Sequence, residues 1–485
     1  MYIKSNIPKL LIILTTTISI FKSEKHCSFW EKYILWHDCS HDKNQTTHCT
    51  YFQRFVSWDN ECSPGADPPH PSKCTELETV LMKKEYCEYN PDEFLDVPQI
   101  IARHGYKSET HEVITQDGYI LELHRIPNLK EQAQPVFLQH GLFGSSADWL
   151  LNGNDSIAFL LVDHGYDVWM GNSRGNTYSD GHNSYPNHNP LYWNFSFHEM
   201  GVNDLDKVIM YIVFVTKLPG ELIYMGYSTG AMLGFIYSTT MPISERLIKL
   251  IVAISPSVYP SHLTSPIKYL APFIDDSKWV MENLGMHQFL PKNKILELLS
   301  MHCRLLGIQK IVCDNFIFSI FGYSEEEFNV PMLPILLSKM PSGVSTKTIS
   351  QFVQSIKRGG TFQRFDHGED LNYKLYGTKR PPKYDLKKVK TPVYIIYSMY
   401  DWFSNHTDVL HLANHLRHVV EAYKVDKNHF GYLDFLFGKE LVQLVIQPIL
   451  QVLELFKINT TYKINVDDED DDDDYDPENY DDEYE

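Results

Sequence analysis

The sequence is short of positive charge and of long apolar runs. Lysine and arginine number 43 against 62 aspartates and glutamates, so the formal net charge is −19, and nucleic acid is not an expected partner. Beyond the N-terminal region, no run reaches the roughly 18 apolar residues of a transmembrane helix, so no transmembrane segment is expected. No repeat of about 20 to 50 residues is visible either, which excludes solenoids and propellers.

The two ends of the chain differ in composition from the rest. Lys4 and Lys9 precede an uncharged run of twelve residues from Leu10 to Phe21, which is too short to span a bilayer and is typical of a secretory signal peptide over residues 1–23. Residues 467–485 contain fourteen acids and no base, a composition that predicts a disordered acidic tail. The protein is therefore expected to be secreted or delivered to the lysosomal lumen.

The cysteines lack the C-x-x-C spacing of zinc sites, so disulfide bonds are the better interpretation. Six of the eight lie between Cys27 and Cys87, and we expect residues 24–95 to form a small disulfide-held module whose connectivity the sequence leaves open. Cys303 and Cys313 form a separate close pair. Sequons for N-glycosylation occur at five asparagines, consistent with the same compartment: Asn44, Asn154, Asn194, Asn405 and Asn459.

Residues 96–466 carry the pattern of an α/β fold. A hairpin signal around Asp117-Gly118 is followed by short apolar runs that alternate with helical stretches, which predicts a mostly parallel sheet covered on both faces. The predicted strands lie at 111–115, 119–123, 136–139, 166–170, 222–225, 250–255, 393–398 and 419–425. The long connection between the strands at 250–255 and 393–398 predicts a mostly helical cap over about 257–390, where a ligand pocket is expected.

Gly226-Tyr227-Ser228-Thr229-Gly230 is the most informative motif. It follows the strand at 222–225 and precedes the helical stretch Ala231 to Ser238, which is the setting of a G-x-S-x-G nucleophile turn. Glycine on either side permits the sharp turn that exposes the serine hydroxyl. The sequence therefore predicts Ser228 as a catalytic nucleophile.

A nucleophilic serine needs a base and a group that orients the base, in the chain order acid then histidine. Asp401 lies just beyond the strand at 393–398 and is the predicted acid, with Asp408 as the nearest alternative. His429 lies in a loop after the strand at 419–425 and is the predicted base. The region also holds His406, and three further histidines are expected on a solvated helix face over 408–420: His411, His415 and His418.

The charge that develops on an ester oxygen requires two backbone N–H groups. His140 to Ser146 follow the strand at 136–139. We expect the Leu142 amide of this loop and the Thr229 amide after the nucleophile to form the oxyanion hole.

These motifs, together with the stretch from Gly165 to Asn176, resemble the acid lipase family, the gastric and lysosomal lipases of the α/β-hydrolase fold. The resemblance runs from about Val97 to Leu455. It implies Ser228, Asp401 and His429 as the catalytic residues and the Leu142 and Thr229 amides as the oxyanion hole, and the Cys303/Cys313 pair resembles the family's cap disulfide.

Two departures from the family pattern concern the catalytic residues. The family has His and Gln on either side of the serine, where this chain has Tyr227 and Thr229. The family motif His-Leu-Asp-Phe aligns without gaps on His429 to Tyr432. A second alignment places Leu433-Asp434-Phe435 on its last three residues and Tyr432 on the histidine, and the triad then lacks its base.

The sequence thus predicts a serine ester hydrolase and favours a lipase that cleaves acylglycerols or sterol esters at a lipid surface through an acyl-enzyme, with no metal and no organic cofactor. Two alternatives share the scaffold. One is a catalytically weak or inactive lipid-binding protein, and the other is an acyltransferase.

Overall fold

A computed structural model describes the chain in two compact units, residues 1–89 and 90–485. Its described residues are the backbone of 29–30, 34–41, 47–54 and 57–58, and residues 91–128, 130, 132–270, 288–289, 320–322, 327–329 and 332–458. The predicted signal peptide, the acidic tail, the Cys303/Cys313 pair, Asn44 and Asn459 lie outside the described residues. The same holds for most of the Cys-rich module.

In the first unit the described backbone forms two antiparallel strand pairs. β1 (Phe29–Trp30) pairs with β4 (Ser57–Trp58). β2 (Ile34–His41) pairs with β3 (Thr47–Arg54), in a register that sets Cys39 opposite Cys49.

The second unit is built on one nine-stranded sheet with the order β15-β14-β11-β10-β7-β8-β6-β5, and β9 pairs with β6. The neighbours from β15 to β8 pair in parallel, whereas β6 is antiparallel to β5, β8 and β9. The strands are β5 (Glu109–Ile114), β6 (Tyr119–Ile126), β7 (Pro135–Gln139), β8 (Asp167–Met170), β9 (Gly181–His182), β10 (Leu222–Tyr227), β11 (Ile248–Ile254), β14 (Val393–Ser398) and β15 (Val419–Val425).

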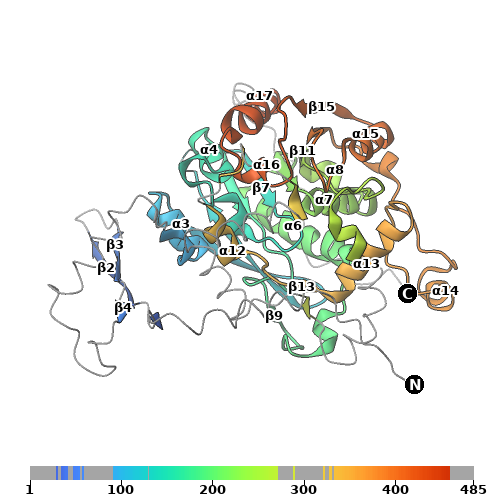
Figure 1. Ribbon diagram of the computed structural model, residues 1–485, viewed down its shortest axis with the longest axis horizontal. Helices are drawn as coiled ribbons and strands as arrows, with labels where there is room; N and C mark the ends of the chain where they lie inside the picture. Colours follow the sequence, from blue (N-terminus) through green and yellow to red (C-terminus); the bar gives the residue numbers. More distant parts are fainter. Residues whose placement is uncertain are drawn as a thin grey trace, which may run out of the picture. The chain divides into compact units, whose positions relative to one another are not determined.

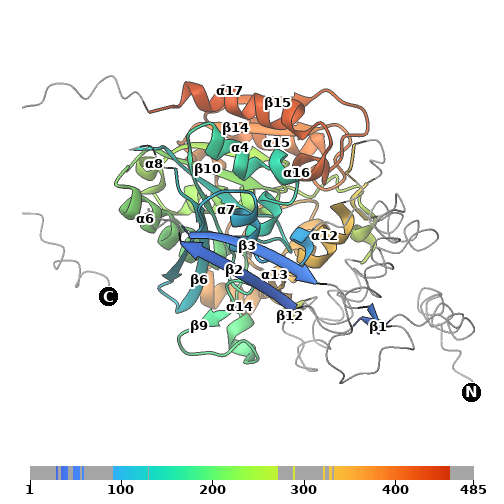
Figure 2. The ribbon, with the colours of Figure 1, turned by 90° about the vertical axis from the view of Figure 1, so that its left-hand side faces the viewer.

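Helices cover both faces of this sheet. On one face, α6 (Leu205–Thr216), α7 (Thr229–Thr240) and α15 (His406–His415) contribute to one buried apolar cluster. On the opposite side lie α4 (Ile157–Asp163) and α17 (Gln447–Leu455), as Figures 1 and 2 show. Every residue of β7, β8, β10 and β14 is buried, as expected for strands covered on both faces. Shorter helices are α3 (Val97–Arg103), α5 (Phe197–Glu199), α8 (Ser244–Leu247) and α16 (Asp434–Phe437).

The predicted fold class is confirmed. Each predicted strand of the sheet is present within a few residues of its expected bounds, and the sheet is mostly parallel with helices on both faces. The helix expected over 408–420 instead begins at His406 and ends at His415, because the chain must extend again to enter β15 at Val419.

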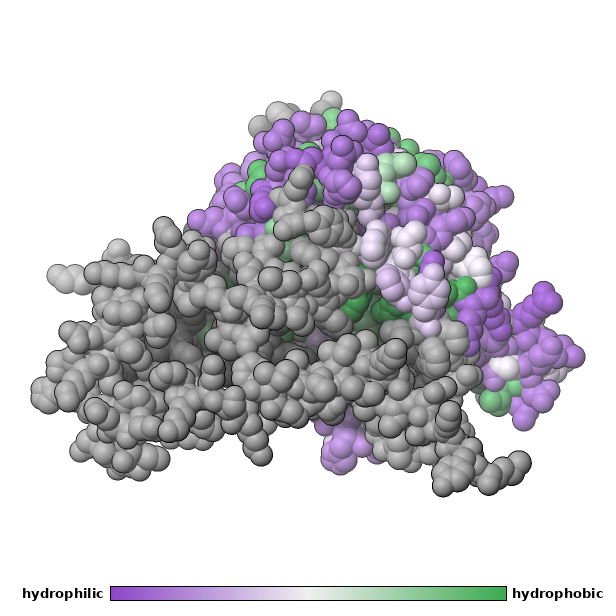
Figure 3. Space-filling model, viewed as in Figure 1, coloured by the Kyte–Doolittle hydropathy of each residue, from purple (hydrophilic) through white to green (hydrophobic). Residues whose placement is uncertain are grey.

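The connection from β11 to β14 contains helices in its described part. These are α12 (Leu333–Lys339), α13 (Thr346–Lys357) and α14 (Glu369–Tyr376), with β12 (Gln288–Phe289) paired to β13 (Val344–Ser345). On the face shown in Figure 3, the described surface is mostly hydrophilic, with scattered hydrophobic residues. Within the described residues, no helix combines the length and the apolar character that crossing a bilayer requires.

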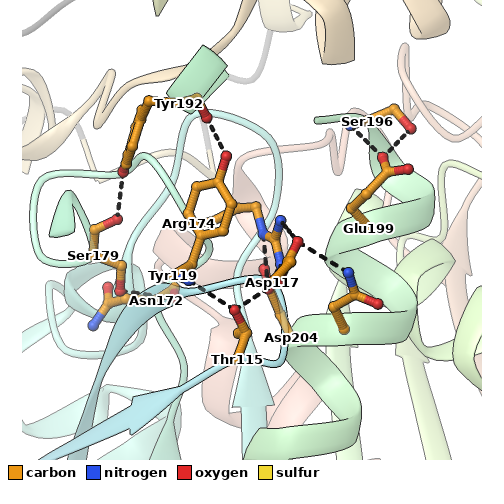
Figure 4. Close-up of polar contacts among 11 residues, drawn as sticks. Thr115, Asp117, Tyr119, Asn172, Arg174, Ser179, Tyr192, Ser196, Glu199 and Asp204 are labelled. Carbon is orange, nitrogen blue, oxygen red and sulfur yellow. Dashed lines mark hydrogen bonds and ion pairs between the residues drawn. The ribbon is translucent and has the colours of Figure 1, made fainter. Parts of the chain in front are cut away.

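A buried guanidinium ties the loop after β8 to the rest of the body. Arg174 donates two hydrogen bonds to Asp117 in the β5–β6 turn, at 2.6 and 2.9 Å, and two to Asp204 ahead of α6, at 2.8 and 2.5 Å (Figure 4). Its guanidinium carbon lies 3.9 Å from the ring centroid of Tyr119. Burial alone would raise the pKa of Asp117, but the hydrogen bonds and charge of Arg174 lower it to about 2. Arg174 therefore fixes three separate segments of the chain.

Replacing Arg174 by glutamine is expected to lower the free energy of unfolding by about 3 to 5 kcal/mol, because the Asp204 carboxylate would stay buried without its partner. Arg246→Gln, at an exposed position, is the matched control and should change it by less than about 0.5 kcal/mol. Denaturant unfolding measures both. Equal stability of the two variants would show that the Arg174 network does not hold the fold.

Candidate active site

Ser228 lies on a sharp turn between β10 and α7, as the motif predicts. Its backbone has φ 56° and ψ −118°, a conformation that is rare for residues other than glycine. A Cβ at Gly226 would lie 2.5 Å from the Ala231 nitrogen, and one at Gly230 would lie 2.2 Å from the Gln139 oxygen. Both positions must therefore be glycine for the strand to turn into the helix beside β7.

The loop predicted to carry one oxyanion donor lies beside the serine. A Cβ at Gly141 would be 3.2 Å from Ser228 Cβ. Leu142 is the next residue, so its amide lies where this loop passes close to the serine. Among the hydrogen bonds of the described residues, none uses the amide of Leu142 or of Thr229. Both N–H groups are thus available to a ligand oxygen.

His140 supports this loop rather than acting on a substrate. Its Nδ1 lies 2.8 Å from the Gly141 oxygen, and its Nε2 accepts a hydrogen bond of 3.0 Å from the Ser173 amide. Burial lowers the pKa of His140 to about 4, so the imidazole is neutral at physiological pH. The sequence motif contains His140 but does not predict this supporting role for its side chain.

Asp401 is buried at the end of β14, where the predicted acid should lie. Its Oδ1 accepts hydrogen bonds of 2.8 Å from the amides of Phe403 and Ser404, and its Oδ2 accepts one of 2.5 Å from the Ser255 hydroxyl. Burial raises the pKa of Asp401. The alternative acid, Asp408, accepts from the backbone and ring of His262 instead, both at 2.7 Å. Among the described residues, no imidazole hydrogen-bonds to Asp401.

The structure does not bring His429 to Ser228. The His429 side chain is exposed, its ring centroid lies 5.2 Å from that of Tyr400, and it forms no hydrogen bond with Ser228 or Asp401. The reason is the local turn. The Ser398 hydroxyl donates a hydrogen bond of 2.5 Å to the Phe430 carbonyl, and the Gly431 amide donates one of 2.6 Å to the Asp434 carboxylate. These contacts leave residue 429 at the surface and direct residue 432 inward.

Tyr432 is the ring that lies next to the serine. It is buried, and its hydroxyl interacts with the side chains of Ser228 and Tyr227. The same hydroxyl would be 3.4 Å from a Cβ at Gly141. Burial raises the pKa of Tyr432, and the interactions with Ser228 and Tyr227 offset only part of this shift. The phenol is therefore protonated at neutral pH and can donate a hydrogen bond but not accept a proton.

A second hydroxyl and two aromatic rings complete the surroundings of Ser228 and Tyr432. Ser228 Oγ lies 3.2 Å from Ser257 Oγ. The Tyr432 ring packs on Phe403, with centroids 4.7 Å apart, and on Phe321 from the cap, at 5.8 Å. Neither Ser257 nor the aromatic cover was anticipated from the sequence. Within the described part of the chain, no group of three His, Cys, Asp or Glu side chains could hold a metal ion.

Asp148 is a buried carboxyl behind the oxyanion loop. Its Oδ2 lies 2.1 Å from where a Cβ at Gly144 would be, and its Oδ1 has no hydrogen-bond partner among the described residues. Burial raises the pKa of Asp148 to about 7, although amide hydrogen bonds at Ser145 and Asp148 itself oppose the shift. This carboxyl changes charge in the physiological range, next to the predicted oxyanion hole.

A serine on a strand-to-helix turn, an acid after a later parallel strand and two open amides define the α/β-hydrolase class. The sequence model described as "alpha/beta hydrolase fold" matches residues 134–279, and the one described as "Partial alpha/beta-hydrolase lipase region" matches residues 97–153. Three relatives agree with these matches.

Lipase 1 of Drosophila melanogaster is 35% identical, over 75% of this chain and 80% of the fly protein. Lipase lipl-1 of Caenorhabditis elegans is 36% identical, over 75% and 92%. Human gastric triacylglycerol lipase is 32% identical, over 75% and 92%. The chain belongs to this family of lipases with the α/β-hydrolase fold, and the family supports ester hydrolysis by a lipase-type enzyme.

Because the buried Asp148 carboxyl favours its protonated form, the protein should be more stable in acid than at neutral pH. Because its pKa is raised above that of an unfolded Asp, the folded state holds the extra proton below about pH 7, and that stabilisation is lost as the pH rises through this value. From about pH 5 to pH 8 the free energy of unfolding should fall by roughly 2 kcal/mol more in the parent than in Asp148→Asn. Denaturant unfolding at both pH values measures this difference.

Asp155→Asn, an exposed acid on the same segment, is the control for this comparison and should retain the pH dependence of the parent. An unchanged pH dependence in Asp148→Asn would mean that the carboxyl at position 148 does not titrate in this range.

Proposed function

We propose that this protein is a lipase-family protein that binds acylglycerols or sterol esters at Ser228 and hydrolyses them slowly. The observation that carries the proposal is the buried Tyr432 beside Ser228, where a catalytic imidazole is needed. The relatives bear the names of lipases, among them gastric triacylglycerol lipase, and this supports a lipid ester as the ligand.

The binding half of the machinery is available for such a ligand. With the ester carbonyl carbon beside Ser228 Oγ, its oxygen can accept hydrogen bonds from the Leu142 and Thr229 amides, which have no other partner among the described residues. Such donors stabilise the charge on the oxygen as the serine adds. Asp401 would keep its role as the buried acid, held by Ser255, Phe403 and Ser404.

Among the described residues, the proton of Ser228 has no good acceptor in this arrangement. When Oγ bonds to the carbonyl carbon, its proton must leave, and in a complete triad an imidazole takes it and passes it to the leaving alcohol. A phenol with a raised pKa cannot do so. Loss of the histidine from a Ser-His-Asp triad can lower kcat by about a million-fold, with residual catalysis of about 1,000 to 10,000-fold over water from the oxyanion hole and binding.

A second candidate is a fully active lipase in which His429 is the base. Its support is family membership and the position of His429 on the loop after β15, three residues before Tyr432, with φ 59°. This candidate requires the loop to rearrange so that the exposed ring replaces Tyr432 at Ser228.

Tyr432→His is expected to raise hydrolysis of triolein and the rate of fluorophosphonate labelling by at least about 100-fold, because general-base catalysis contributes on that order. The new imidazole would lie beside Ser228, where the charge of Asp401 also acts on residue 432. Activity on an emulsion and labelling of the pure protein measure the change.

The controls separate the two candidates. His429→Ala should leave labelling within about two-fold of the parent, since its imidazole does not contact Ser228, and Ser228→Ala should abolish labelling. If His429→Ala removes activity while Tyr432→His adds none, the slow-turnover proposal fails and the second candidate takes its place.

We also propose that the protein acts in a secreted or lysosomal compartment, on lipid surfaces. Support comes from the signal-like residues 1–23 and from exposed sequon asparagines at Asn154 and Asn194. Expression of the full chain in cultured insect cells should yield a glycosidase-sensitive protein in the medium or in lysosomes, with an N-terminus near residue 24. A cytosolic, unglycosylated product would contradict this assignment.

A further inference from the structure

Helix α14 in the cap presents large apolar side chains to solvent. Leu371 is 50% exposed, Tyr373 64% and Leu375 59%. Leu371 and Leu375 are four residues apart, a spacing that sets two side chains next to each other on a helix surface. Single exposed apolar side chains are ordinary, whereas a group of them marks an interaction surface.

Hydrogen bonds hold the opposite face of α14 to the cap. The buried Asn372 side chain donates a hydrogen bond of 2.7 Å to the Asp366 carboxylate and accepts one of 2.9 Å from the His367 amide. The Tyr376 hydroxyl donates one of 2.9 Å to the Phe365 carbonyl. Figure 1 shows α14 at the edge of the second unit, away from the sheet. The exposed apolar side chains therefore extend outward from a helix that is fixed on its inner face.

The chain from α14 to the start of β14 is rich in positive charge. Residues 369–390 contain seven lysines and arginines against three aspartates and glutamates, in a chain whose formal net charge is −19. All seven cationic residues are exposed: Lys374, Lys379, Arg380, Lys383, Lys387, Lys388 and Lys390. We call residues 374–390 the cationic segment.

Most of these charges are not neutralised by the protein. Lys379 lies 3.4 Å from the Glu369 carboxylate, and Lys390 pairs with Glu245 at 2.8 Å. The remaining five cations form no ion pair with any described residue. Lys374 is one of them, and its place three residues after Leu371 sets a free ammonium beside the exposed apolar side chains.

The cationic segment and α14 are attached to the same strip of cap backbone. The Arg364 amide donates a hydrogen bond of 2.9 Å to the Pro382 carbonyl, and the Tyr384 amide donates one of 3.1 Å to the Phe362 carbonyl. The next two residues of that strip, 365–366, hold α14. The apolar side chains and the cations therefore extend from neighbouring points, so one surface can contact both.

We propose that α14 and the cationic segment dock this protein on a lipid surface that carries anionic headgroups. The apolar side chains of α14 enter the boundary between headgroups and acyl chains, while the cations contact the negative headgroups. Because the chain as a whole is negative, docking through its basic part also orients the protein on the surface. The inference rests on the proposed action at lipid surfaces, and it adds the charge of that surface and the residues that contact it.

Sedimentation of the full chain with vesicles of phosphatidylcholine, with and without about 30 mol% phosphatidylserine, tests the proposal. Partition onto the phosphatidylserine vesicles should be at least about 100-fold stronger, because each lysine or arginine near an anionic surface contributes about five-fold. Raising the salt concentration from about 0.1 M to about 1 M should remove most of this difference, since salt screens exposed charges.

The double variant Arg380→Gln and Lys383→Gln isolates the charge term. It should weaken binding to phosphatidylserine vesicles about 25-fold and leave binding to pure phosphatidylcholine within about two-fold. The matched control is Arg246→Gln with Arg417→Gln, which removes two exposed cations from other parts of the unit. The control should change neither affinity by more than about two-fold.

The double variant Leu371→Ser and Leu375→Ser isolates the apolar term. It should weaken binding to phosphatidylserine vesicles about ten-fold, because two leucine side chains no longer enter the lipid. Its control is Leu191→Ser with Leu455→Ser, two leucines that are exposed elsewhere. Thermal unfolding checks that each variant is folded. If one is not, the comparison of the two vesicles with the unaltered chain still decides.

Equal binding to the two vesicles, or unchanged binding to phosphatidylserine in the folded variant without Arg380 and Lys383, overturns the proposal. Carbodiimide cross-linking of the cationic segment to residues 467–485 in the lipid-free chain would assign this surface to the acidic tail and would also overturn it. The vesicles contain no acylglycerol or sterol ester, so turnover does not affect the result. Hydrolysis of triolein without a preference for phosphatidylserine refutes the docking surface alone, and docking with an inert Ser228 refutes the proposed hydrolysis alone.

Discussion

The turn at Ser228 is the constraint on which the rest of the site depends. A serine with φ 56° between a buried strand and a buried helix is strained, and it persists because Gly226 and Gly230 let the backbone approach Ala231 and Gln139 more closely than any side chain allows. The turn places the Ser228 side chain beside Gly141, Ser257 and Tyr432. It also places the Thr229 amide at the start of α7. Substrate geometry is thus determined by backbone packing.

Buried polar side chains that take no part in the predicted catalysis hold the loops around this turn. His140 bridges the Gly141 carbonyl to the Ser173 amide, and the adjacent Arg174 joins the β5–β6 turn to the start of α6 (Figure 4). Both side chains are buried and satisfied by the protein itself. The oxyanion loop is therefore preorganised before any ligand arrives, and a change at the base position leaves it intact.

The sheet could be predicted because its strands are continuous apolar runs and its helices lie between them, as β10 and α7 illustrate. The places of Ser228 after β10 and of Asp401 just beyond β14 could be predicted for the same reason, whereas their catalytic roles stay predictions. The residue that acts as the base could not be identified in this way, because two alignments of the segment are possible. The ungapped alignment selects His429, whereas Leu433-Asp434-Phe435 favours Tyr432, and the hydrogen bonds at Phe430 and Gly431 agree with the second register. The hydrogen bond from Ser255 to Asp401 joins segments that are 146 residues apart, so no local sequence pattern predicts it.

The Ser255 hydroxyl on Asp401 has a kinetic consequence. In a complete triad the carboxylate stabilises a transient imidazolium. Here Asp401 Oδ2 already accepts a hydrogen bond from the neutral Ser255 hydroxyl. An imidazolium that reached Asp401 would therefore meet a carboxylate that already shares its charge with a hydroxyl, and the acid would stabilise it less than a carboxylate reserved for the imidazole.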